Sequence, residues 1–211
     1  MPIDCGCHEP HGRRRIVLTG GPGAGKTAVL ETLKHSLCRH IVILPESASI
    51  VFGGGFPRMT SLAGRQASQR AIFFVQRELE LLTDSTDDFA IVLCDRGLVD
   101  SAAYWPGPDE IWPSVGMARK DALSRYDAVI HLRVPDAAQG YGHQNPLRVE
   151  SPEEAAVIDE RILRAWDGHP RRFVIEATSG FLAKATRAIE IIRDEVPECC
   201  RDHIAPRART G

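Results

Sequence analysis

Five stretches of mostly hydrophobic residues run along the chain, separated by longer segments in which apolar residues recur at helical spacing. The five stretches lie within residues 15–19, 40–47, 88–95, 126–134 and 171–177. They do not alternate apolar with polar residues, which is typical of strands buried on both faces of a sheet. Such strands, in alternation with helices, predict an α/β fold in which helices cover both faces of a parallel sheet.

The intervening segments predict four main helices. Their expected bounds are residues 26–37, 64–83, 151–166 and 181–195. The third begins at Ser151 and has Glu154 three residues later, which is the spacing of a capping box. Residues 135–150, just before it, are polar and contain Gly, Gln and Pro. We expect this segment to be a lid loop over the site described below.

Length and composition predict a single domain. The chain has 211 residues, of which 43% are hydrophobic and 26% charged, and this suits one soluble domain with a full-sized core. Neither an internal repeat nor a low-complexity segment stands out. We therefore expect one domain over residues 13–196, with flexible tails at 1–12 and 197–211.

The charge and cysteine content disfavour several classes of partner. The net charge is −2, and the basic run at residues 13–15 is the main cluster of like charges, so we do not expect nucleic acid as a partner. No apolar run approaches the roughly 20 residues that span a bilayer, and residues 1–15 do not resemble a secretory signal. The six cysteines show no disulfide framework, which favours a reducing, cytoplasmic location.

Cysteine and histidine residues gather near both ends of the chain. Structural zinc sites favour cysteine pairs separated by two to four residues, and the spacing at these ends is tighter and less regular. We interpret them as incidental residues of mobile tails, with a zinc site as the alternative. The residues in question are Cys5, Cys7, His8, His11, Cys199, Cys200 and His203.

A phosphate-binding loop is the strongest motif in the chain. The stretch GGPGAGKT follows the first strand, opens the first helix and fits G-x-x-x-x-G-K-[ST] in full. Its glycines allow backbone N–H groups to turn toward a phosphate, and the helix amino terminus adds positive potential. We expect Lys26 to reach the β- and γ-phosphates and Thr27 to bind Mg²⁺. The predicted nucleotide-binding residues are Gly20, Gly21, Pro22, Gly23, Ala24, Gly25, Lys26 and Thr27.

Missing motifs narrow the choice among P-loop proteins. The chain has no Asn-Lys-x-Asp, Thr-Lys-x-Asp or Asp-x-x-Gly of regulatory GTPases and no Leu-Ser-Gly-Gly of transporter ATPases. A small-molecule kinase, an atypical hydrolase and a nucleotide-dependent switch all remain open.

Asp95 and Arg96 follow the third predicted strand, where motor-type ATPases usually have two carboxylates. Asp95 is placed to hold Mg²⁺ directly or through water. Arg96 would lie beside the phosphates or the acceptor, although a structural salt bridge is the alternative. A kinase should suppress attack by water, and an Asp-Arg pair suits that task better than an Asp-Glu pair.

Glu46 is our candidate base for the acceptor hydroxyl. It follows the second strand and should face the carboxyl edge of the sheet, where ligands bind in such folds. A capping or salt-bridging role is the alternative for Glu46, and Asp100 is a second candidate base. Arg70, on the long helix, could grip an acceptor.

The predicted lid loop carries Arg148, which we expect to neutralise charge developing during phosphoryl transfer, with a solvated loop charge as the alternative. Aromatic residues Tyr104, Trp105 and Trp112 could stack on a base or a sugar-linked ring. Packing in the core or under the lid is the favoured interpretation for all three.

These stretches together resemble the AAA_28-type P-loop ATPase/kinase family, which includes the nicotinamide riboside kinase part of a bacterial regulator. The matching stretches are RRIVLTGGPGAGKTAVLETL, LPESAS, QRAIFFVQRELE, CDRGLVDSAAYW and NPLRVESPEEAAVIDERILRAW. More distantly, Glu46 and the Asp95–Arg96 pair resemble those of deoxynucleoside and nucleotide kinases. The resemblance implies a five-stranded parallel sheet with the Asp95 strand beside the P-loop strand, and a lid that carries arginine near Arg148.

We therefore expect an ATP- and Mg²⁺-dependent kinase of a small hydroxylated or nucleoside-like metabolite. The alternative is a nucleotide-dependent binding or switch protein, or an NTPase, with little turnover. GTP could replace ATP, because no motif that reads the base is recognisable. The segment FGGGFPRM, residues 52–59, is where we expect specificity for the acceptor to lie.

Overall fold

A five-stranded, fully parallel sheet forms the centre of the molecule. The computed structural model describes residues 4–34, 37–86, 88–135, 151–177 and 180–204. The strand order is β2-β3-β1-β4-β5, which confirms the predicted sheet and places the strand of Asp95 beside the P-loop strand. The strands are β1 (Arg14–Thr19), β2 (Ile41–Leu44), β3 (Ile91–Asp95), β4 (Ala128–Leu132) and β5 (Arg172–Ile175).

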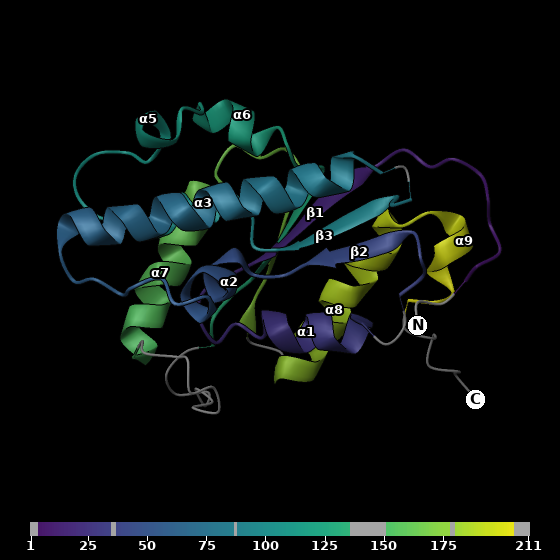
Figure 1. Ribbon diagram of the computed structural model, residues 1–211. Helices are drawn as coiled ribbons and strands as arrows, with labels where there is room; N and C mark the ends of the chain where they lie inside the picture. The colour runs from purple at the N-terminus through teal and green to yellow at the C-terminus, as the bar shows by residue number, and fades with distance from the viewer. Residues whose placement is uncertain (1–3, 35–36, 87, 136–150, 178–179, 205–211) are drawn as a thin grey trace.

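Helices cover both faces of the sheet (Figure 1). Successive residues of β1 point to opposite faces, so Ile16 and Leu18 join the core that contains α1 and α8, whereas Val17 joins the core that contains α3. Both cores exclude water, and this explains why the strands are mostly apolar. The helices are α1 (Lys26–Lys34), α2 (Ser47–Gly53), α3 (Leu62–Asp84), α4 (Asp100–Tyr104), α5 (Trp112–Val115), α6 (Arg119–Leu123), α7 (Pro152–Ala165), α8 (Gly180–Glu195) and α9 (Glu198–Arg201).

The four expected helices correspond to α1, α3, α7 and α8. The capping box at the start of α7 is present, because the Ser151 side chain accepts from the backbone N–H of Glu154 and the Glu154 side chain accepts from that of Ser151. Helix α3 begins two residues earlier than expected, because Ser61 provides its amino-terminal cap by accepting from the backbone N–H of Gly64. The short helices α2, α4, α5, α6 and α9 have too few residues to show a helical period in the sequence.

Several residues in the segments expected to be tails, 1–12 and 197–211, contact the core, although most of residues 4–12 are exposed. Cys200 in α9 and Ile204 just after it are fully buried in the core that contains α1 and α8. At the other end, Cys5 is half-buried against the same core. The flexibility of the two tails remains a prediction.

None of the described helices is both long enough and apolar enough to cross a membrane. The predicted lid loop at 135–150, with Arg148, falls almost entirely on residues 136–150, which lie outside the described part of the chain.

Candidate nucleotide-binding site

The P-loop connects the carboxyl end of β1 to α1 and comes very close to β4. A Cβ atom at Gly20 would lie 2.1 Å from the carbonyl oxygen of Leu132, and the φ angle of Gly20 is +134°. Any residue with a side chain would therefore overlap the neighbouring strand and be strained at this position. The glycine that the motif requires for its tight turn is thus also required by packing against the sheet.

Lys26 turns back over the loop that precedes it. Its Nζ atom donates to the carbonyl oxygen of Gly20 at 2.8 Å and to that of Gly21 at 3.0 Å, and the side chain is buried. Burial and the charge of Arg96 lower the pKa of Lys26 to about 8, against the opposing effect of Asp95 and Glu46. An anionic phosphate bound here would favour the charged form of Lys26 again.

The P-loop is also held by Asp159 of α7, a residue that our sequence analysis did not identify. The backbone N–H of Gly21 donates to Asp159 Oδ1 at 2.8 Å. His131 of β4 donates to the same oxygen at 2.8 Å, and Arg133 lies 3.2 Å from Oδ2. Burial opposes ionisation of Asp159, but the hydrogen bond and charge of His131 outweigh it, so its pKa is lowered. Asp159 is therefore ionised, and its carboxylate positions the P-loop. The only sequence signal for this role is that Asp159 lies within the apolar face of the predicted helix.

Asp95 has the environment of a cation ligand. It is the last residue of β3 and pairs in register with Leu18, two residues before the P-loop. Its Oδ1 atom is buried and has no hydrogen-bond partner among the residues the structure describes. Burial raises the pKa of Asp95, although the charge of Lys26 opposes that shift. An unsatisfied buried carboxylate oxygen is costly unless a cation or donor satisfies it.

The side-chain oxygen atoms of Asp95 and Thr27 are suitable ligands for a magnesium ion, which these two residues would hold. Thr27 is exposed in the first turn of α1, next to Lys26. In phosphoryl transfer, Mg²⁺ neutralises charge on the β- and γ-phosphate oxygens.

Arg96 adopts a left-handed backbone conformation, with φ of +72°, and is the single non-glycine with positive φ among the described residues. Its Nε atom donates to Glu46 Oε1 at 2.8 Å, and its Nη1 atom donates to the carbonyl oxygen of Gly20 at 3.2 Å. Its guanidinium also lies 5.4 Å from the ring centre of Tyr104. Non-glycine residues in this conformation cost about 1–3 kcal/mol and cluster at functional sites.

Glu46 lies two residues after the end of β2 and caps the start of α2, and its two carboxylate oxygens have different partners. Oε1 accepts from Arg96, and Oε2 accepts from the Ser49 hydroxyl at 2.6 Å. Burial raises the pKa of Glu46, but the charge of Arg96 and the two hydrogen bonds outweigh it and lower the pKa to about 2. Glu46 is thus ionised at neutral pH. The salt bridge that was an alternative for both Glu46 and Arg96 is present, and it lies beside the P-loop.

Asp100, the second candidate base, is buried and both its oxygens are already used. Oδ1 accepts from the Thr19 hydroxyl, and Oδ2 accepts from the backbone N–H of Gly97 at 2.7 Å. It links β1 to the loop after β3. Both carboxylates have partners on both oxygens, but the Glu46 side chain is 31% exposed and that of Asp100 only 4%, which favours Glu46 as the group available to an acceptor.

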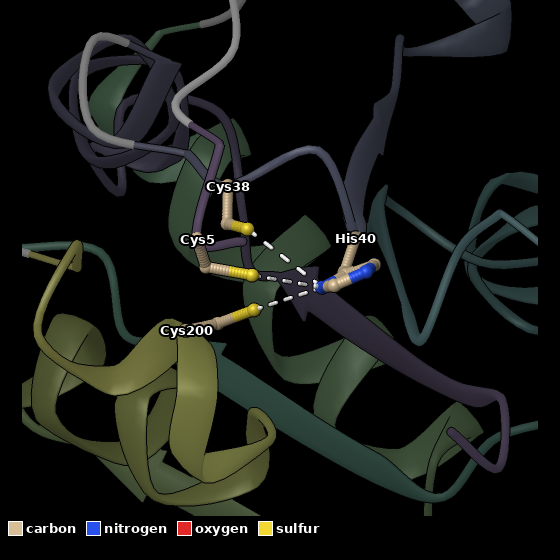
Figure 2. Close-up of side chains that lie close together, drawn as sticks. All are labelled: Cys5, Cys38, His40 and Cys200. Carbon is tan, nitrogen blue, oxygen red and sulfur yellow. Dashed lines mark hydrogen bonds between the residues drawn. The ribbon is translucent and has the colours of Figure 1, made fainter. Parts of the chain in front are cut away.

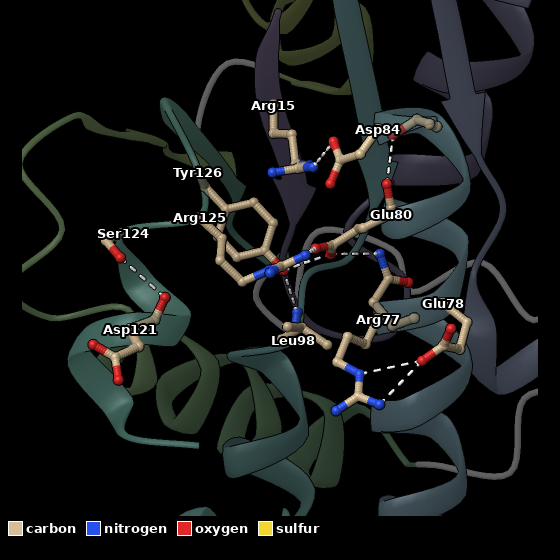
Figure 3. A network of polar contacts seen from close by, with 12 residues as sticks. Arg15, Arg77, Glu78, Glu80, Asp84, Leu98, Asp121, Ser124, Arg125 and Tyr126 are labelled. Atoms are coloured by element: carbon tan, nitrogen blue, oxygen red, sulfur yellow. Dashed lines mark hydrogen bonds and ion pairs between the residues drawn. The ribbon is translucent and has the colours of Figure 1, made fainter. Parts of the chain in front are cut away.

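A buried polar network supports the loop after β3 from the far side (Figure 3). Glu80 of α3 is fully buried and accepts from the Tyr126 hydroxyl at 2.7 Å and from Arg125 at 2.8 and 2.9 Å. The Tyr126 oxygen in turn accepts from the backbone N–H of Leu98 at 2.7 Å. The segment Arg96–Leu98 is therefore fixed both to the P-loop and to α3.

The other candidates are not gathered at this site. Trp112 is buried in the core beside α3, and Trp105 packs against that core, in agreement with the favoured packing interpretation. Arg70 lies half-buried in α3, and no contact joins it to Glu46 or Arg96 among the described residues. In the segment expected to confer specificity, Arg58 covers the ring of Phe52 at 3.8 Å.

Comparison with solved structures places the fold among nucleoside and nucleotide kinases. Deoxyadenosine kinase from M. mycoides, with bound dATP, is 14% identical, with a TM-score of 0.58 over 85% of this chain and 99% of that one. Thymidylate kinase from Candida albicans is 14% identical, with a TM-score of 0.60 over 87% of this chain and 92% of that one.

Sequence comparison gives the family. No curated protein matches the sequence. The profile of the AAA_28 family, described as an AAA domain, matches residues 15–182, which include every described residue of the site. The chain therefore belongs to the AAA_28 family, as a P-loop nucleotide-binding domain with a kinase-like fold.

Proposed function

We propose that the protein is a Mg²⁺-dependent kinase that transfers the γ-phosphoryl group of ATP to a hydroxyl group of a small nucleoside-like metabolite. The observation that carries this proposal is the Glu46–Arg96 ion pair beside the P-loop. Arg96 of this pair occupies the position where an NTPase that activates water would have a second carboxylate after Asp95.

The charges of Lys26 and Arg96 suit phosphoryl transfer. Lys26 and Arg96 both donate to the carbonyl oxygen of Gly20, so two cationic groups converge on the start of the phosphate-binding loop. Cations at this point would stabilise the negative charge that spreads over the oxygens of the transferred group. Arg148 of the predicted lid would add a third cation.

Glu46 is suited to orient the acceptor. With a pKa of about 2 it is always ionised at neutral pH, so it accepts a hydrogen bond from a hydroxyl but removes a proton only late in the reaction. A loose transition state places little demand on the strength of a base. The structural similarity to deoxyadenosine and thymidylate kinases supports a nucleoside-like acceptor.

The test is ADP formation from ATP with a panel of ribonucleosides, deoxyribonucleosides and nucleoside monophosphates. We expect turnover that depends on one class of acceptor and that falls by a factor on the order of 10² to 10⁴ in Glu46→Gln. Nucleotide affinity should be retained in that variant. Glu78→Gln, which changes an exposed carboxylate on α3, is the matched control.

ADP formation that no acceptor accelerates and that Glu46→Gln leaves unchanged would overturn the kinase proposal. Tight nucleotide binding without turnover would favour the switch protein instead.

A further inference from the structure

The structure brings together cysteine and histidine residues from three distant parts of the chain. Cys5 lies in the amino-terminal segment, Cys38 and His40 lie in the turn before β2, and Cys200 lies in α9 (Figure 2). The four ligand atoms of this group are all within 4.8 Å of one another. We call this set the four-residue cluster.

The distances within the cluster match a tetrahedral metal site. His40 Nδ1 is 3.4 Å from the Sγ atom of Cys5, 3.7 Å from that of Cys38 and 3.4 Å from that of Cys200. Zinc bonds of about 2.3 Å to sulfur and 2.0–2.1 Å to nitrogen, at tetrahedral angles, separate the two atoms by about 3.6 Å. All three measured separations lie close to that value.

Hydrogen bonding does not account for this arrangement. A ring nitrogen of a neutral histidine either accepts one hydrogen bond or donates one. Three sulfur atoms nevertheless lie within 3.7 Å of the single Nδ1 atom of His40 (Figure 2), and the Sγ atom of Cys199 lies 4.0 Å from it. A cation placed between the four atoms would satisfy all of them at once.

The cluster is closed and firmly positioned. Cys38, His40 and Cys200 are buried. The carbonyl oxygen of His40 accepts from the backbone N–H groups of Ala90 at 2.8 Å and Ile91 at 3.0 Å, which ties it to the start of β3. The backbone N–H of Cys200 donates to the carbonyl oxygen of Pro197, the residue before α9, at 2.9 Å. A closed set of four protein ligands is typical of structural zinc sites, whereas catalytic sites keep a position open.

We propose that Cys5, Cys38, His40 and Cys200 bind one zinc ion, which joins the amino-terminal segment and α9 to the turn before β2. Three thiolates and an imidazole in a tetrahedral arrangement select zinc over the harder divalent cations. The site lies where β2 and β3 begin, and the P-loop follows the opposite ends of the strands. Its role is therefore to hold the ends of the chain and not to take part in nucleotide chemistry.

A neighbouring group gives an internal comparison. His11 Nε2 is 3.6 Å from the Sγ atom of Cys7 and 3.3 Å from that of Cys199, but this group has three ligands and all are only half-buried. Of the residues named for the zinc alternative in the sequence, His8 and His203 belong to neither group. Cys38 and His40, which complete the cluster, lie far from both ends of the chain.

The first experiment measures the zinc content of the full chain, purified under reducing conditions, by mass spectrometry of the metal. We expect Cys38→Ser and Cys200→Ser to lose one equivalent of zinc per chain relative to the wild type. Cys7→Ser, in the three-residue group, and Cys94→Ala, in β3, should retain the wild-type content. A loss in Cys7→Ser without a loss in Cys38→Ser, or iron in place of zinc, would overturn the proposal.

A second experiment on the wild-type chain covers the case in which the variants do not fold. The protein is stripped of metal under reducing conditions and titrated with cobalt(II). We expect intense visible absorption, typical of tetrahedral cobalt with thiolate ligands, at one equivalent, and its loss when zinc is added. Six reactive thiols should appear in denaturant with chelator. Absence of both zinc and the cobalt spectrum, or fewer than six thiols because of a disulfide, would contradict the proposal.

Discussion

Arg96 Nε donates to Glu46 Oε1 at 2.8 Å, and this ion pair joins the loop after β3 to the loop after β2. The left-handed backbone of Arg96 directs its side chain across the P-loop, where Nη1 also reaches the carbonyl oxygen of Gly20. The pair thus connects the ends of three neighbouring strands at the position where a nucleotide and an acceptor would meet. It also lowers the pKa of Glu46 to about 2 and, through the charge of Arg96, helps burial to lower that of Lys26.

The Glu46–Arg96 ion pair should make the free energy of unfolding depend on pH in the acidic range. Because the pKa of Glu46 falls from 4.5 to about 2 on folding, its contribution is fully present above pH 4.5 and is lost as the pH falls toward 2. We expect the difference in free energy of unfolding between the wild type and Glu46→Gln to be largest above pH 4.5 and to shrink below it. Urea denaturation from pH 3 to 6 measures this difference. A difference independent of pH would show that the pair does not shift the pKa of Glu46.

Removal of the P-loop ammonium should abolish tight nucleotide binding. Lys26→Ala removes a buried cation that faces the expected phosphate site, so we expect affinity for Mg-ATP to fall by a factor on the order of 100, as judged by calorimetry. Lys34→Ala is the matched control, because Lys34 lies on the same helix and pairs with Glu31 at the surface. Equal affinities for Mg-ATP in the two variants would show that Lys26 does not contact the nucleotide.

Nucleotide binding should also take up protons. Burial and Arg96 lower the pKa of Lys26 to about 8 in the free protein, and a bound polyphosphate should raise it. We expect an uptake of about half a proton at pH 8 and almost none at pH 6, where Lys26 is already charged. Calorimetry in buffers with different ionisation enthalpies measures the uptake directly. Proton release at pH 8 would contradict this assignment.

The lowered pKa of Lys26 in the folded chain gives a pH dependence of the same sign as that of Glu46, in a higher pH window. Between pH 8 and 10.5 the unfolded chain binds a proton at Lys26 that the folded chain has lost, so this residue's contribution to stability rises with pH in that window. Lys26→Ala should remove this rise as well as the proton uptake, whereas Lys34→Ala should preserve both.

The turn at Gly20 should tolerate no side chain. A Cβ atom there would overlap the Leu132 carbonyl oxygen, so Gly20→Ala must displace either the loop or β4, and we expect a loss of at least about 2 kcal/mol in the free energy of unfolding. Gly53→Ala is the control, because a Cβ atom at Gly53 would meet open space. Thermal and urea denaturation of both variants test the difference. A Gly20→Ala variant as stable as Gly53→Ala would mean that the loop is not held against β4.

Much of the site could be predicted from the sequence because its signals are local. The P-loop is eight consecutive residues, and Glu46, Asp95 and Arg96 each directly follow or end a recognisable strand. In a parallel sheet, strand ends of the same sense meet at one edge, so their mutual proximity was expected. The site roles of Arg148 and Arg70 remain predictions.

The sequence alone determined the sheet and its helical layers through its apolar runs, because strands buried on both faces carry few polar residues. It determined the phosphate-binding loop through the glycine-rich motif. Only the tertiary structure decided which side chains complete the sites. Asp159 reaches Gly21 across 138 positions of sequence, and Cys5 meets His40 and Cys200 only after both ends of the chain fold onto the turn before β2. Such contacts leave no signal in the sequence separation of the partners, because the partners are placed by separate elements whose packing sets the distance between them.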